Sequence, residues 1–162
     1  MIVYFDSSAL VKMVMAEEGT ATVIDIWGLA ASRVTSHAAY PEVRAALAAA
    51  ERCGRIDTAT QREAVADLER LSGSMYLVAL ERDLAWRAGT LAEDHALRGY
   101  DSVHLASAVG MSAPRVVVVT WDKKLALAAS QRGLAVVPDP PRWSAGGPAG
   151  MPARSNWASR RP

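Results

Sequence analysis

The sequence predicts an α/β fold with a mainly parallel central sheet flanked by helices. Short apolar runs alternate with helical stretches along most of the chain, which is the pattern of a parallel sheet with crossover helices. The runs at residues 2–5 and 116–119 are apolar throughout, as in strands covered on both faces. Asp6 directly follows the first run, and Asp122 lies shortly beyond the second. Ligands of open α/β sheets bind beyond the carboxyl ends of the strands, so both acids lie where a site is expected.

The elements follow from apolar periodicity and from the residues that start or stop helices. The predicted elements are a strand at 2–5, helices at 8–18 and 20–31, a strand at 32–36, helices at 37–52 and 57–71, a strand at 75–80, helices at 81–97 and 103–111, a strand at 116–119, a helix at 123–132 and an edge strand at 134–137. Gly19 and Gly133 each stop a helix. Pro41 fits only the first turn of a helix, which places Glu42 near that helix start, just beyond a strand end.

Composition bounds the class of protein. The 162 residues fit one domain, and 51% hydrophobic with 22% charged residues is ordinary for a globular protein. No apolar run approaches the roughly 20 residues that span a bilayer, and the N-terminus enters a strand, not a signal segment. Cys53 is the single cysteine, which fits a reducing compartment, so we expect a cytoplasmic protein without membrane contact.

The chain divides into a folded body, residues 1–137, and a tail, residues 138–162, rich in Pro, Gly and Arg, which we expect to be irregular. Four arginines against one aspartate give the tail a net charge of +3, which leaves −2 for the body of a chain whose total is +1. The body therefore lacks the excess positive charge that attracts nucleic acid nonspecifically, and any binding of nucleic acid must depend on a local basic surface.

Four acids stand at positions that a parallel sheet can bring to one edge. Asp6, Glu42, Asp101 and Asp122 each lie near a strand end or a helix start. Taken singly, each acid has a purely structural explanation, because the aspartates are also good N-caps and Glu42 is also a first-turn acid favoured by the helix dipole. Taken together, clustered carboxylates repel unless a cation binds, and oxygen ligands suit Mg²⁺ or Mn²⁺.

The chain resembles the PIN-domain proteins, and within them the VapC toxins of type II toxin–antitoxin pairs. The resemblance rests on the stretches 3–12, 42–47, 99–106 and 120–126, of which Gly99-Tyr100-Asp101-Ser102-Val103-His104-Leu105-Ala106 is the most specific. It covers residues 2–137 in the expected order, and the tail departs from the usual ending.

The resemblance implies a PIN-like nuclease domain and an endoribonuclease that uses Mg²⁺ or Mn²⁺ to hydrolyse RNA phosphodiester bonds. It implies that Asp6, Glu42, Asp101 and Asp122 are the catalytic, metal-binding acids. It also implies a homodimer and a cognate antitoxin protein as partner. Ser7 and Thr120 lie beside two of these acids and are expected to orient them, with ordinary turn and capping roles as the alternative.

Other interpretations were weighed against this one. His104 lies three residues after Asp101 and is either a ligand or proton donor or, as we expect, a hydrogen-bonded structural histidine. Trp86 falls on an apolar helical face and is expected in the core or at a dimer contact. A phosphatase of the haloacid-dehalogenase kind needs a second aspartate where Ser8 stands. The alternative from another class is a catalytically silent PIN-fold module that binds RNA or protein.

Overall fold

The structure is a computed structural model that describes residues 1–111 and 115–138. Its strands are β1 (Ile2–Phe5), β2 (Ser32–Ser36), β3 (Tyr76–Val78), β4 (Val116–Val119) and β5 (Ala135–Val137). Its helices are α1 (Ser7–Val14), α2 (Thr20–Leu29), α3 (Ala39–Arg52), α4 (Thr58–Ser72), α5 (Arg82–His95), α6 (Gly99–Val109) and α7 (Lys123–Gln131). The predicted irregular tail lies outside the described residues, except for Pro138.

The strands form one parallel sheet in the order β3-β2-β1-β4-β5, which confirms the predicted fold class. β1 is the central strand, and Phe5 pairs in register with Val119 of β4. The carboxyl ends of β1 and β4 therefore stop side by side. Because all the strands run the same way, the segments that follow them leave from one edge of the sheet.

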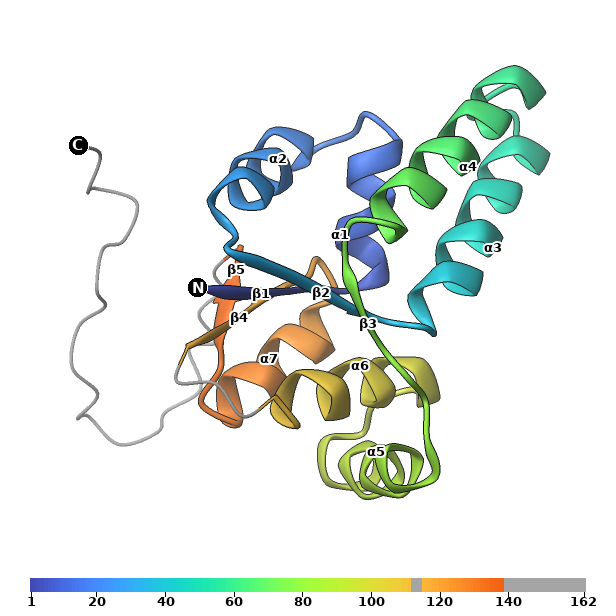
Figure 1. The fold of residues 1–162 in the computed structure, drawn as a ribbon. Helices are drawn as coiled ribbons and strands as arrows, with labels where there is room; N and C mark the ends of the chain where they lie inside the picture. The colour runs from blue at the N-terminus through green and yellow to red at the C-terminus, as the bar shows by residue number, and fades with distance from the viewer. Residues whose placement is uncertain (112–114, 139–162) are drawn as a thin grey trace, which may run out of the picture.

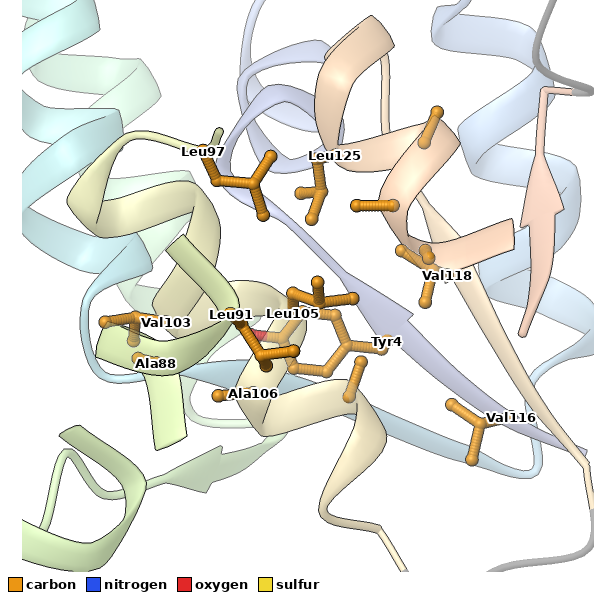
Figure 2. Packing of buried hydrophobic residues seen from close by; sticks show 14 of the residues in the cluster. Tyr4, Ala88, Leu91, Leu97, Val103, Leu105, Ala106, Val116, Val118 and Leu125 are labelled. Atoms are coloured by element: carbon orange, nitrogen blue, oxygen red, sulfur yellow. The ribbon is translucent and has the colours of Figure 1, made fainter. Parts of the chain in front are cut away.

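Helices cover both faces of the sheet (Figure 1). α1 to α4 pack on one face and α5 to α7 on the other, and each face has its own apolar core. β1 serves both cores by alternation, since Val3 and Phe5 belong to one cluster and Tyr4 to the other. Figure 2 shows the Tyr4 ring among Leu91, Leu105, Ala106 and Val118.

Local chemistry explains several helix ends. Asp6 caps α1, Gly19 adopts a φ of 95° before α2, and Pro41 occupies the first turn of α3, where its missing N–H has no intrahelical partner. α1 ends at Val14 instead of Glu18, where Met15 has extended backbone. No helix of the described chain is both long and apolar enough to cross a bilayer.

The structure excludes one alternative for each of two residues. α6 begins at Gly99 instead of at the predicted residue 103, so Asp101 lies inside its first turn and the N-cap alternative for Asp101 does not hold. Trp86 is 69% exposed on α5, which excludes the core and leaves the dimer contact as a prediction. The buried stripe of α5 runs through Leu84, Ala88 and Leu91, which leaves Trp86 on the opposite side of the helix.

Candidate metal-dependent active site

Asp6 lies directly after the central strand and is almost fully buried, at 4% exposure. Its Oδ1 accepts hydrogen bonds from the Ala9 N–H and the Ser8 hydroxyl, and its Oδ2 accepts one from the Thr120 hydroxyl at 2.6 Å. Burial raises the pKa of Asp6 above its ordinary value, although nearby His104 and these donors oppose the rise. The carboxyl group is therefore held in one orientation at a position that disfavours its charge.

Glu42 projects from the first turn of α3 and is oriented by two donors. The Ser7 hydroxyl and the His104 ring nitrogen Nε2 both contact Glu42 Oε2, at 2.5 Å and 2.8 Å. Partial burial raises the pKa of Glu42, but the hydrogen bonds from His104 and Ser7 outweigh it and hold the pKa below its ordinary value. Glu42 is therefore ionised at neutral pH.

His104 is a buried link between the core and Glu42. Its Nδ1 lies 2.8 Å from the Tyr4 hydroxyl, and the ring is 2% exposed. Burial raises the pKa of Tyr4 far above its ordinary value, so the hydroxyl keeps its proton and donates a hydrogen bond to Nδ1. With Nδ1 as the acceptor, the single N–H of the ring lies on Nε2 and donates to Glu42. This assignment agrees with the structural histidine expected from the sequence and adds a contact that the sequence did not reveal.

Asp101 and Asp122 are joined by one arginine. Arg98 precedes α6, and its Nε donates to Asp101 Oδ2 at 2.9 Å while its Nη2 donates to Asp122 Oδ2 at 3.1 Å. Asp122 also caps α7, because its Oδ1 accepts from the Lys124 and Leu125 N–H groups. The pKa of Arg98 is raised by its hydrogen bond to Asp101 and by the negative charges of Asp101, Asp122 and Glu42.

The two residues expected to orient the acids lie in contact with them. Thr120 donates to Asp6 and accepts from the Asp122 N–H at 3.0 Å, and Ser7 donates to Glu42. The four acids thus belong to one connected region: Thr120 links Asp6 to Asp122, Arg98 links Asp122 to Asp101, and Ser7 joins the start of α1 to Glu42.

The donor set fits a hard divalent cation. All four acids offer oxygen ligands, and a cationic guanidinium already lies between two of them, where a positive charge is needed. Within residues 1–111 and 115–138, no three His, Cys, Asp or Glu side chains lie close enough together to hold one ion. Binding an ion to three of the acids therefore requires side-chain rearrangement.

An open cleft of about 490 Å³ lies on the α7 side of the acids. Arg98, Trp121, Asp122, Lys123 and Lys124 line it. The folded body has a net charge of −2, yet three basic side chains, those of Arg98, Lys123 and Lys124, line this cleft beside the acids. The cleft is the kind of local positive surface that a phosphate backbone requires.

Comparison with known proteins decides the family. The family model described as "PIN domain" matches residues 3–130. This chain belongs to the PIN-domain family. Within this PIN-domain chain, 137 residues are 41% identical to Ribonuclease VapC45 of Mycobacterium tuberculosis (strain CDC 1551 / Oshkosh), a match covering 85% of this chain and 95% of that protein. The resemblance stated from the sequence motifs is thereby confirmed.

Solved structures of low sequence identity share the fold of this PIN domain. One is VapC20 of Mycobacterium tuberculosis, described as a sarcin-ricin loop cleaving toxin, with a TM-score of 0.61, 17% identity and coverage of 78% of this chain and 94% of that chain. Another is a toxin–antitoxin complex from Klebsiella pneumoniae, with a TM-score of 0.55, 16% identity and coverage of 75% and 88%. These likenesses confirm the PIN-like fold.

Arg98 and the contacts of His104 were not predicted from the sequence. Arg98 stands three residues before Asp101, a spacing that brings side chains together on a helix, and this was an available signal. The contact between His104 and Glu42 spans 62 positions, and no local pattern in one sequence encodes it.

Proposed function

We propose that this PIN-domain protein is a metal-dependent endoribonuclease and the toxin of a toxin–antitoxin pair. The observation that carries the proposal is the connected set of carboxylates at the carboxyl edge of the sheet, in a chain 41% identical to a ribonuclease over 137 residues. Asp6, Glu42, Asp101 and Asp122 are proposed as the metal-binding acids, with Mg²⁺ or Mn²⁺ as the ion.

A bound divalent ion supplies a water of lowered pKa and neutralises charge on the scissile phosphate. The side chains of the protein do the positioning. Thr120 and Ser8 hold Asp6, and His104 and Ser7 hold Glu42, so both carboxylates are fixed before substrate arrives. Fixed carboxylates do not have to reorganise during the reaction, which favours catalysis.

The proposed partners follow from the same reasoning. RNA approaches along the cleft beside Lys123 and Lys124, whose charges suit backbone phosphates. A cognate antitoxin is proposed because a related fold is known in a toxin–antitoxin complex. A homodimer is proposed from the family, and an RNA-cleaving toxin meets its substrate in the cytoplasm.

The test is cleavage of total cellular RNA by the purified protein in Mg²⁺, in Mn²⁺ and in EDTA, with Asp101→Asn as the comparison. Discrete fragments that require metal and vanish in the variant support the proposal. Absence of cleavage by folded, antitoxin-free protein with either metal contradicts it and favours the silent RNA- or protein-binding module. A mass spectrum of the sample establishes that no antitoxin remains bound.

A further inference from the structure

Arg98 bridges two of the proposed metal ligands while remaining largely in solvent. Its side chain is 77% exposed, yet its guanidinium contacts Asp101 and Asp122 at 2.9 Å and 3.1 Å. Apart from these ion pairs, no hydrogen bond from the Arg98 side chain is found in the described part of the chain. The guanidinium can therefore leave without disturbing the core.

Asp122 can serve a cation through only one of its oxygens. Its Oδ1 already accepts two N–H groups from the first turn of α7, from Lys124 and Leu125, both at 2.9 Å. Giving up those bonds would uncap the helix. Oδ2 is the oxygen left for a metal ion, and Arg98 holds it.

We propose that Arg98 is an internal competitor of the metal ion: it occupies Asp122 Oδ2 in the metal-free protein and must leave before a divalent cation can bind there. The inference rests on the proposed function, because it takes Asp101 and Asp122 as ligands. Exposed ion pairs are weak and screened by solvent, whereas a divalent ion brings a larger charge and prefers carboxylate oxygen. The ion therefore displaces Arg98, and the competition lowers the affinity for metal only several-fold.

The displaced side chain remains useful. Arg98 lines the cleft with Lys123 and Lys124, so a released guanidinium stays where RNA phosphates approach. Its planar array of N–H donors matches a phosphate group better than an ammonium does. Metal binding would thus convert Arg98 from a partner of the acids into a partner of the substrate.

The first test is calorimetric titration of Mn²⁺ into metal-free wild-type protein and Arg98→Gln. The variant is expected to bind Mn²⁺ about three- to tenfold more tightly, because the competing cation is gone. Arg70→Gln is the matched control, since Arg70 is 78% exposed and pairs with Asp67 on α4, and it should bind as wild type does. Equal or weaker binding by Arg98→Gln overturns the proposal.

Asp101→Asn separates this inference from the proposed function. If Asp101→Asn loses Mn²⁺ binding and Arg98→Gln binds no more tightly than wild type, the metal site stands and the role of Arg98 is wrong. If Asp101→Asn binds Mn²⁺ as wild type does, the ion does not use this site and both proposals fail.

A second readout follows Arg98 itself. In a ¹H–¹⁵N spectrum of the metal-free protein, the Arg98 Nε–H signal is identified by its absence in Arg98→Gln. Saturation with Mg²⁺, which is diamagnetic, should shift this signal or broaden it through exchange with water, because its hydrogen bond to Asp101 is lost. A signal that is unchanged at saturating Mg²⁺ overturns the proposal.

Discussion

The hydroxyl of Thr120 donates a 2.6 Å hydrogen bond to Oδ2 of Asp6, which lies 114 positions earlier in the chain. The same oxygen of Thr120 accepts the Asp122 N–H at 3.0 Å. One buried hydroxyl therefore ties the acid after β1 to the acid after β4. Because both strand ends belong to the centre of the sheet, this link fixes the relative position of the two carboxylates.

Thr120→Val should separate this role from ordinary burial of a hydroxyl. Valine keeps the shape but leaves Asp6 Oδ2 and the Asp122 N–H each without this partner, so RNA cleavage should fall by about tenfold or more. The free energy of unfolding should fall by about 1–2 kcal/mol. Cleavage assays and urea denaturation measure the two effects.

Thr35→Val is the matched control. Thr35 is as buried as Thr120, and its hydroxyl donates to the Phe5 carbonyl at 2.7 Å instead of to a carboxylate. The free energy of unfolding should fall in Thr35→Val by about as much as in Thr120→Val, whereas RNA cleavage by the folded Thr35→Val protein should change little. Equal losses of cleavage in the two variants would show that Thr120 has no special role.

His104→Ala should be strongly destabilising. It removes a buried ring, leaves the Tyr4 hydroxyl without this acceptor and leaves Glu42 with Ser7 as its remaining donor, so the free energy of unfolding should fall by about 2–4 kcal/mol. Combining it with Tyr4→Phe should give less than the sum of the single effects, by about 1 kcal/mol, because the two residues share one hydrogen bond. Strict additivity in urea denaturation would argue against the link, and His37→Ala at an exposed position is the control.

The raised pKa of Asp6 predicts a pH dependence in the metal-free protein. Folding raises the pKa of this acid, so the folded state favours the protonated carboxyl group. The resulting stabilisation is fully present below the unfolded pKa, near 3.8, and is lost as the pH rises through the folded pKa. Asp6→Asn does not ionise and escapes this loss. In EDTA, the unfolding free energy of wild type should therefore fall relative to Asp6→Asn between pH 3.8 and neutrality. Urea denaturation across this range checks the sign, and a relative rise would contradict it.

Gly19→Ala should disturb the segment that carries Asp122. Gly19 has a φ of 95°, and an added Cβ would lie 2.6 Å from the Trp121 ring. Backbone strain and the clash together should cost about 2–3 kcal/mol in unfolding free energy. Gly54→Ala is the control, because Gly54 has a φ of 70° with no atom within 4 Å of the added Cβ, so it should cost only about 1 kcal/mol. Equal costs in thermal or urea denaturation would remove the role of the Trp121 contact.

The fold was predictable because its signals are local. The all-apolar runs of β1 and β4 predicted strands covered on both faces, and both strands do lie between two apolar cores. Where a local signal conflicted with its context, the prediction failed. Gly99 suggests a break before the helix, yet it forms the first residue of α6, so the helix predicted at 103–111 begins four residues earlier than expected.

The site was predictable only in outline. Strand ends indicated which acids meet, but the contacts of His104 with Glu42 and of Arg98 with Asp122 join segments far apart in the chain. Such contacts depend on how α3, α6 and α7 pack around the sheet, and periodicity within one helix does not specify them. The core alternative for Trp86 was wrong for the same reason, since the sequence does not specify which face α5 buries, and a dimer contact of Trp86 stays a prediction.

The most direct test of the central claim compares two helix caps. Asp6 caps α1 through Ala9 at 2.9 Å, and Asp57 caps α4 through Thr60 at 2.7 Å, but only Asp6 lies at the carboxyl edge of the sheet among the other acids. The measurement is the rate of RNA cleavage in Mg²⁺ by Asp6→Asn and by Asp57→Asn. The account predicts that Asp6→Asn loses at least about a hundredfold in rate while Asp57→Asn cleaves as wild type does. Wild-type rates in a folded Asp6→Asn protein would show that Asp6 is only a cap and would contradict the account.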